Sequence, residues 1–371
     1  LAAVAARELE PLCFRLSGTD NAYTYQANAH TINIVAGTEA DTVIELDQQS
    51  WQGLVYDVES APGLLYSGKL GQGAGDAMLF VRWEPALRAM FHGRPLYDIN
   101  AQLKGEKGNP LSPEQSFSLE DSVQSKREFL AAAGYLLLKN VFSAEELEQY
   151  RTAAEQLKKR AVEGDKLSWW GTNKQGDSVL CRVIHASVMP VFADLYQHPH
   201  LQTMASSLLD GLVAMDANEV DGVTVIYKNP GMASGLSDLP WHRDCGLGGH
   251  ALMCPKIICS IYLYDADESS GPLKFLPGSH KASYGFMDAN DPNAPSGVTV
   301  PAKAGDVTLH YSDVMHAAPP PSGEDGPYRV SILLNYDRDF KHHAGKRHYN
   351  DVLLSSEDGQ ITHLEKLIDN D

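Results

Sequence analysis

The sequence of 371 residues lacks a long apolar run, since no stretch approaches the roughly 18 apolar residues that a membrane-spanning helix requires. It is also poor in positive charge: 30 lysines and arginines against 48 aspartates and glutamates give a formal net charge of −18. Binding to nucleic acid or to anionic lipid needs clustered basic side chains, so partners of both kinds are excluded. We expect a small-molecule partner, and the composition leaves the oligomeric state open.

Cysteine is scarce as well, and its five copies have no pair at the C-x-x-C spacing of a zinc site. An odd number without such pairs excludes the disulfide framework of a small secreted domain. The expected compartment is therefore reducing, which predicts an intracellular, cytoplasmic protein. The five are Cys13, Cys181, Cys245, Cys254 and Cys259.

The first hundred residues predict a small α/β domain. Strand-like runs follow one another in "TINIVA", "TVIELDQQSWQGLVY" and "GLLYSGKLGQGAGDAMLFVRW", and "EPALRAMFHGRPLYD" then has a helical pattern. The next segment, "NAQLKGEKGNPLSPEQSFSLED", mixes Gly, Pro, Ser and charge without apolar periodicity, which is typical of a linker. We predict a first domain over 1–105, a linker over 106–121 and a second domain over 122–371.

The second domain combines helices with many short strands. It is predicted to begin with a helix, a Gly-punctuated buried strand and a second helix, which starts with a capping box formed by Ser143 and Glu146. From Asp221 onward, short apolar runs recur between Pro- and Gly-rich turns, a pattern typical of a β-sandwich or barrel. The predicted fold class is thus α+β, with a C-terminal jelly roll flanked by helices and a smaller N-terminal α/β domain.

One short stretch, "LPWHRDCGLGGH", carries the clearest chemistry. In a strand, His242 and Asp244 project to the same face, so an imidazole nitrogen and a carboxylate oxygen converge. A facial set of two histidines and one carboxylate needs another histidine, and "GDVTLHYSDVMHAA" offers both His310 and His316. Arg329 follows in an apolar strand, where an unpaired guanidinium would be costly and favours a carboxylate ligand.

These motifs occur in a specific order: H-x-D, "GPLKFLPGSHK", "AGDVTLHYSDVMH", and an arginine thirteen residues after the last histidine. In this order the chain resembles the phytanoyl-CoA dioxygenase family of Fe(II)- and 2-oxoglutarate-dependent oxygenases over roughly residues 120 to 340, and "AAAGYLLLKNVFSAEELEQYR" resembles the family's N-terminal segment. The resemblance implies a double-stranded β-helix that uses Fe(II), 2-oxoglutarate and O2. The resemblance also ranks His316 above His310 as the distal ligand.

Residue by residue, the resemblance implies that His242, Asp244 and His316 are the catalytic iron ligands and that Arg329 binds the far carboxylate of 2-oxoglutarate. Arg182 is a further candidate for cosubstrate binding, and Trp241 is a candidate substrate contact because it adjoins the motif. The chain departs from the family after the distal histidine, where Ala317 and Ala318 stand in place of a small hydroxyl residue. Because halogenating relatives lack the carboxylate, Asp244 implies hydroxylation or a related oxidation.

The N-terminal domain resembles the SCP-2-like sterol carrier family in "ADTVIELD", "YSGKL", "GDAMLF" and "ALRAMFHGRP". That resemblance implies an apolar tunnel and hence a hydrophobic, lipid-like substrate for a hydroxylase. Two alternatives stay open: an oxygenase that acts on an amino acid or another polar metabolite, and a carrier that binds metal and lipid without turnover.

Overall fold

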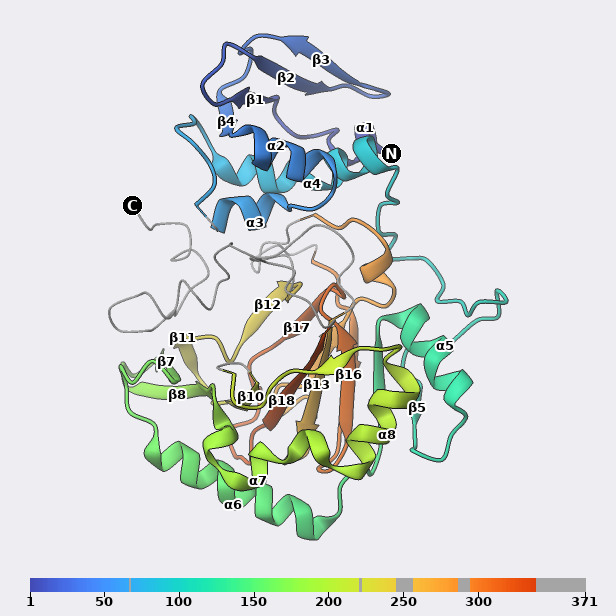
Figure 1. Ribbon diagram of the computed structural model, residues 1–371, viewed down its shortest axis with the longest axis vertical. Coiled ribbons are helices and arrows are strands. Elements are labelled where there is room, and N and C mark those ends of the chain that lie inside the picture. The colour runs from blue at the N-terminus through green and yellow to red at the C-terminus, as the bar shows by residue number, and fades with distance from the viewer. Residues whose placement is uncertain (67, 220–221, 245–255, 286–293, 338–371) are drawn as a thin grey trace.

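The computed structural model describes the chain except for residues 67, 220–221, 245–255, 286–293 and 338–371, and its elements form two groups with separate apolar cores. Figure 1 shows the N-terminal group, in blue, at one end of the larger second group, with α3 and α4 on the side that faces it. No helix in the described part of the chain is long and apolar enough to cross a membrane.

The N-terminal group is a four-stranded sheet with helices packed against it. The strands lie in the order β3-β2-β1-β4, with β1 parallel to β4 and the other neighbours antiparallel. Its core includes Phe14, Phe80 and Trp83, all buried. The elements are α1 (Ala2–Ala5), β1 (Leu12–Leu16), β2 (Ala22–Ala27), β3 (Ile32–Ala36), β4 (Thr42–Leu46), α2 (Gln48–Val55), α3 (Ala61–Tyr66) and α4 (Ala77–His92).

The expected α/β composition of this domain is confirmed, but two predicted strand runs are partly or wholly helical. The second half of "TVIELDQQSWQGLVY" forms α2, and "GLLYSGKLGQGAGDAMLFVRW" contributes to α3 and α4. Strand β4 ends at Leu46 because Asp47 caps α2, with its carboxylate accepting a 2.6 Å hydrogen bond from the Ser50 backbone N–H. Asp76 caps α4 in the same way through Met78. The "GDAMLFVRW" segment is therefore helical, and it buries Leu79, Phe80 and Trp83 on one face, at the spacing of a helix rather than of a strand.

The second group is built from two facing sheets. The larger sheet has the order β11-β7-β8-β10-β18-β13-β16-β6-β5, with β9 paired to β18, and the smaller one has the order β12-β17-β14-β15. Side chains of the two sheets touch across the interior, where Tyr135 and Phe275 stack with ring centroids 4.4 Å apart. This is the two-sheet arrangement of the predicted jelly roll.

The strands of the second group are β5 (Ser116–Phe117), β6 (Tyr135–Leu138), β7 (Ser168–Asn173), β8 (Ser178–Val183), β9 (Val213–Ala214), β10 (Val223–Tyr227), β11 (Met232–Ser234), β12 (Leu239–His242), β13 (Ile257–Tyr262), β14 (Leu273–Phe275), β15 (Val298–Val300), β16 (Val307–Tyr311), β17 (His316–Ala318) and β18 (Val330–Asp337). The helices are α5 (Val123–Ala133), α6 (Ala144–Arg160), η1 (Ala186–Val188), α7 (Pro190–Ala193), η2 (Leu195–Gln197), α8 (Pro199–Leu208) and η3 (Ser279–Lys281).

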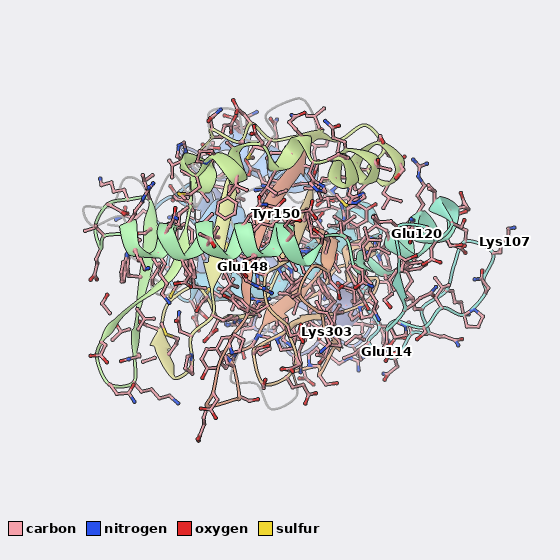
Figure 2. The ribbon with its side chains drawn as sticks, turned by 90° about the horizontal axis from the view of Figure 1, so that it is seen from below. Lys107, Glu114, Glu120, Glu148, Tyr150 and Lys303 are labelled. Atoms are coloured by element: carbon pink, nitrogen blue, oxygen red, sulfur yellow. The ribbon has the colours of Figure 1, made fainter. Side chains whose placement is uncertain are left out.

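Helices α6, α7 and α8 cover the outer face of the large sheet. The predicted capping box of α6 is confirmed: Ser143 accepts a hydrogen bond from the Glu146 backbone N–H, and the Glu146 carboxylate accepts one from the Ser143 N–H. Figure 2 shows α6 crossing this face, with Glu148 and Tyr150 labelled on it. Tyr150 is buried against the sheet, whereas Glu148 is exposed. The inner face of the sheet is thus left to the smaller sheet and the site.

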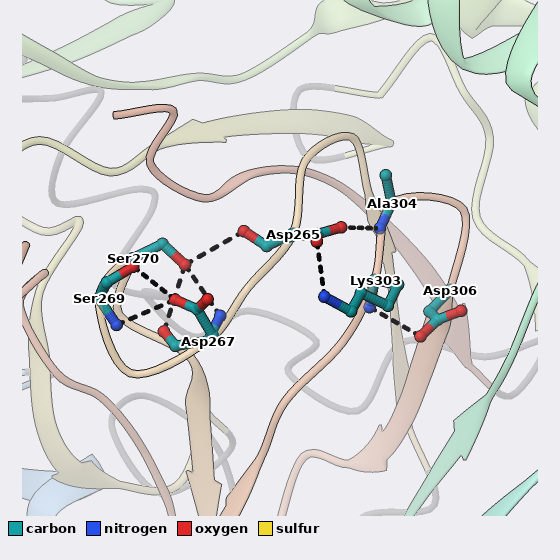
Figure 3. Close-up of polar contacts among 7 residues, drawn as sticks. All are labelled: Asp265, Asp267, Ser269, Ser270, Lys303, Ala304 and Asp306. Carbon is teal, nitrogen blue, oxygen red and sulfur yellow. Dashed lines mark hydrogen bonds and ion pairs between the residues drawn. The ribbon is translucent and has the colours of Figure 1, made fainter. Parts of the chain in front are cut away.

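A polar turn fixes the start of β16, the strand that carries His310. Asp306 accepts a hydrogen bond from the backbone N–H of Lys303 at 2.8 Å (Figure 3). It accepts another from the backbone N–H of Asn140 at 2.9 Å. Gly305 has a φ of +90°, and a Cβ there would lie 2.7 Å from the Phe142 carbonyl oxygen. The Gly-Asp pair is therefore needed for the close approach of this turn to the loop between β6 and α6.

Candidate active site

Two histidines from neighbouring strands of the small sheet form the centre of the site. Strand β12 pairs antiparallel with β17, and His242 lies directly opposite His316 in this register. Opposite residues of such a pair project to the same face, and the two imidazole rings lie 4.1 Å apart. The sheet thus brings together two side chains that are 74 positions apart in the sequence.

Asp244 completes the group just beyond the end of β12. Its Oδ1 lies 3.5 Å from Nε2 of His242 and 3.8 Å from Nε2 of His316. The three potential ligand atoms all lie within 4.8 Å of one another, and in the described part of the chain this is the one such group that offers a metal site. The structure therefore brings together the three residues that the sequence singled out.

The hydrogen bonds of both histidines orient their Nε2 atoms toward this centre. Nδ1 of His242 lies 2.7 Å from the Pro240 carbonyl oxygen, and Nδ1 of His316 lies 3.0 Å from that of Val314. A carbonyl only accepts, so each Nδ1 carries a proton, and each Nε2 is the nitrogen that faces the centre as a potential ligand atom. Burial among other imidazoles holds the pKa of His316 well below its ordinary value, which keeps this ring neutral.

Burial alone would raise the pKa of Asp244, but the surrounding imidazoles of His316, His242 and His310 outweigh it and hold the pKa well below its ordinary value. The group thus offers two imidazole Nε2 atoms and one ionised carboxylate. This donor set suits a non-haem Fe(II) site, in which two histidines and a carboxylate occupy one face and leave the remaining positions open.

His310, the alternative ligand of the sequence analysis, lies on the opposite side of Asp244. It projects from β16 of the large sheet, it is buried, and its Nε2 lies 3.5 Å from Oδ2, the second oxygen of Asp244. The ring nitrogens of His310 have no hydrogen-bond partner among the described residues. His310 therefore lies beside the group of three but approaches a different carboxylate oxygen from the one that faces His242 and His316.

Arg329 precedes β18 and is 3% exposed. Its guanidinium interacts electrostatically with Tyr262, whose hydroxyl lies 3.2 Å from Oγ1 of Thr308. Thr308 is two residues before His310 on the same face of β16, so this row of contacts leads from Arg329 toward the histidines. Nε of Arg329 has no partner among the described residues. A buried cation with a spare donor beside an open metal site is suited to a carboxylate.

Sequence reasoning missed Lys228, which anchors the strand of His316. Its Nζ donates to Asp238 at 2.5 Å and to the carbonyl oxygens of Ala318 and Pro319 at 2.7 and 2.8 Å. Burial, with the charge of Arg329 adding to it, lowers the pKa of Lys228 to about 7. The signal in the sequence was a lysine directly after the apolar run "VTVIY", the same kind of signal that marked Arg329.

The two remaining candidates, Arg182 and Trp241, contact other parts of the chain. Arg182 projects from β8 and stacks over the Trp169 ring at 4.6 Å, and its buried Nε has no partner among the described residues. Trp241 instead packs with Leu276 and Met315, and its Nε1 donates to the Pro295 carbonyl oxygen at 3.1 Å. A role for Arg182 in cosubstrate binding and for Trp241 in substrate contact remains a prediction.

The fold and this group of residues define a class: a jelly-roll protein whose two histidines and one carboxylate could hold a metal between its sheets. The family model "Phytanoyl-CoA dioxygenase (PhyH)" matches residues 130–329, more than half of the chain. The chain belongs to the phytanoyl-CoA dioxygenase family. It is accordingly a 2-oxoglutarate-dependent dioxygenase that uses iron, 2-oxoglutarate and O2.

Several solved structures are similar to this chain at low identity. AviO1 from Streptomyces viridochromogenes is 24% identical, with 59% of this chain and 96% of that chain covered and a TM-score of 0.47. The epimerase SnoN, in complex with Fe3+, alpha ketoglutarate and nogalamycin RO, is 20% identical over 58% and 83% of the two chains, with a TM-score of 0.44. HygX from Streptomyces hygroscopicus, with nickel and 2-oxoglutarate bound, is 18% identical over 59% and 88%, with a TM-score of 0.43.

No curated protein matches the chain. The family match begins at residue 130, so it does not extend to the N-terminal group. The resemblance of that group to SCP-2-like carriers therefore stays a prediction, as do the domain boundaries.

Proposed function

We propose that this protein hydroxylates a C–H bond of a small organic substrate, with His242, Asp244 and His316 as the iron ligands. The observation that carries the proposal is the convergence of their three ligand atoms within 4.8 Å of one another. The buried guanidinium of Arg329, which precedes β18, supports it. When bound, iron and 2-oxoglutarate together activate O2 and couple the oxidative decarboxylation of 2-oxoglutarate to succinate with oxidation of the substrate.

In this proposal Arg329 binds the far carboxylate of 2-oxoglutarate. Its Nε has no hydrogen-bond partner among the described residues and can donate to that carboxylate. Lys228 keeps the strand of His316 at the right distance through its bonds to Ala318 and Pro319. Arg182, with a buried Nε that lacks a partner among the described residues, offers a second carboxylate contact.

His310 has a positioning role in the same proposal. The two atoms concerned, Nε2 of His310 and Oδ2 of Asp244, lie 3.5 Å apart, while Oδ1 faces the two ligand histidines. We propose that, with a proton on Nε2, His310 donates a hydrogen bond to Oδ2 once the metal is bound. That contact would favour binding of the metal by Asp244 through Oδ1 alone. A carboxylate that binds through one oxygen leaves three positions for the two 2-oxoglutarate atoms and O2. The presence of Asp244 itself favours hydroxylation over halogenation, because the carboxylate fills the position that a halide would need.

For the substrate we propose a hydrophobic molecule, on the strength of the N-terminal resemblance. A polar metabolite is the second candidate, and one observation favours it: the inner face of the large sheet carries Ser260, Thr308 and Ser331, all buried. A carrier without turnover is disfavoured, because such a protein has no need of a buried guanidinium beside an open metal site.

The first test is an anaerobic titration of the metal-free protein with Fe(II) and then 2-oxoglutarate. We expect the visible charge-transfer band of the chelated keto acid in the unaltered protein. The variant His316→Ala should lose the band, whereas His30→Ala, at an exposed histidine, should keep it. A folded protein that binds iron but gives no band would refute the cosubstrate site and favour the carrier.

The substrate class is then tested by succinate production. Fatty acyl and sterol-like compounds are compared with amino acids and other polar acids, each at equal concentration. Stimulation of succinate formation by the first set only supports the hydrophobic substrate, and stimulation by the second set only would overturn it.

A further inference from the structure

The metal-ligand segment has a second face, which points away from the site. Side chains of an extended segment alternate, so Trp241 and Arg243 project opposite to His242 and Asp244. Both of the outward residues contact parts of the chain that precede the family domain. Trp241 packs in a cluster with Tyr97, and Nη2 of Arg243 lies 3.9 Å from Oε1 of Glu84 in helix α4.

The contact between Glu84 and Arg243 is buried and belongs to a larger charged cluster. Glu84 is 5% exposed and Arg243 14% exposed at the side chain, and Oε1 of Glu84 accepts no hydrogen bond among the described residues. Nη1 of Arg88, one turn further along α4, lies 3.6 Å from the same oxygen. Glu84 therefore has two guanidinium groups near one carboxylate oxygen, one from its own helix and one from the ligand segment.

The cluster connects the N-terminal group with both ligand strands. Arg88 and Arg94 each pair with Asp57, at 3.0 and 2.6 Å, and Arg94 also interacts with Asp313, three residues before His316. Three acids thus face three arginines, so the buried charges balance. The members are Asp57, Glu84, Arg88, Arg94, Arg243 and Asp313.

Backbone contacts hold the two parts together beside this cluster. The Tyr97 N–H donates to the Ser283 carbonyl oxygen at 2.9 Å, and the Ser283 N–H donates to that of Pro95 at 2.8 Å. The Tyr97 hydroxyl donates to the Pro277 carbonyl oxygen at 3.2 Å. These hydrogen bonds attach the segment that follows α4 to the second group.

We propose that Glu84 of the N-terminal group is a positioning residue for the metal site, acting through Arg243 to hold Asp244 in its ligand geometry. The inference rests on the proposed function, because it takes His242 and Asp244 as ligands. Among the described strands, β12 has one neighbour, β17, and contacts from α4 support the ligand segment on its outward side. The N-terminal group thereby sets the metal affinity of the oxygenase part.

The test is a double-mutant cycle on Co(II) binding to the full-length, metal-free protein. We expect Glu84→Gln and Arg243→Gln each to weaken Co(II) binding roughly tenfold, the lower end of the range for residues that support a ligand. The double variant should bind Co(II) no more weakly than either single variant, because the two residues act as one unit. The d–d absorption of bound Co(II) should change in parallel, which a merely structural role would not cause.

The matched control is Asp76→Asn, which removes a carboxylate from the start of the same helix. Asp76 pairs with Arg82 on the surface, both side chains are exposed, and asparagine also caps helices. Co(II) affinity should stay unchanged in this variant. If Glu84→Gln does not fold, Arg243→Lys is compared with Arg243→Gln. The lysine variant, which keeps the positive charge, should bind Co(II) more tightly than the glutamine variant.

Unchanged Co(II) affinity in folded Glu84→Gln and Arg243→Gln would overturn the inference while leaving the proposed function intact. Additive losses in the double variant would overturn it too, since they would mean that the two residues act independently. Failure of the unaltered protein to bind Co(II) at all would remove the proposed function together with the inference.

Discussion

Replacing Arg329 with glutamine should separate cosubstrate binding from folding. Glutamine keeps a hydrogen-bonding side chain but removes the charge and the fork of donors that suits a carboxylate. Because Arg329 is 3% exposed, water competes little for its donors. The lost interaction should therefore appear almost entirely as weaker binding of 2-oxoglutarate.

The magnitude follows from the kind of contact that is lost. A hydrogen bond to a charged group contributes about 1.5–3 kcal/mol, and about 1.4 kcal/mol corresponds to a tenfold change in affinity. The expected loss for Arg329→Gln is thus roughly ten- to hundredfold in the dissociation constant of 2-oxoglutarate.

The assay is anaerobic calorimetry of 2-oxoglutarate binding to the metal-loaded protein, with pyruvate as a comparison ligand. Pyruvate has the keto acid but no far carboxylate, so its affinity should not depend on Arg329. The control Arg82→Gln, at an exposed ion pair of the N-terminal group, should leave both ligands unaffected. An unchanged preference for 2-oxoglutarate over pyruvate in folded Arg329→Gln would refute the assignment.

Asp244→Ala should abolish iron-dependent turnover and leave cooperative thermal unfolding intact, and full activity in this variant would remove Asp244 from the ligand set. His310→Leu should weaken Co(II) binding roughly tenfold while His310→Gln, which keeps a donor, largely preserves it; equal affinities would exclude the proposed hydrogen bond to Oδ2. Hydrogen bonds from Ser143 and His198 lower the pKa of Glu146 to about 2, so its contribution to stability is present above its ordinary pKa and is lost as the pH falls toward about 2. In that window Glu146→Gln should flatten the pH dependence of the free energy of unfolding by about 1 kcal/mol, after allowance for solvent screening, as measured by denaturant titration against the unaltered protein.

The chemistry of the site could be predicted from the sequence because its donors are rare residue types in recognisable local patterns. H-x-D places two ligands within three residues, and the histidine of "DVMH" stands at a fixed distance from Arg329. The capping box of α6 was predictable for the same reason, since Ser143 and Glu146 act within a single turn. Lys228 was missed because its three partners come from segments that are distant in sequence.

The N-terminal group was harder to predict because its apolar residues fit more than one period over short windows. "GDAMLFVRW" is compatible with a strand until Asp76 is seen to cap a helix that buries Leu79, Phe80 and Trp83 together. Its packing against the sheet then decides between the two, as tertiary contacts often do for short segments.

By itself, the sequence determined the ligand types, the order in which they occur, the excess of acidic residues and the α+β class, because these depend on composition and local spacing. Only the tertiary structure decided that His242 lies opposite His316, that His310 approaches the other oxygen of Asp244, and that Glu84 reaches Arg243. Each of these depends on the register of paired strands or on the packing of a helix against a distant segment, and no local pattern in a chain encodes either one.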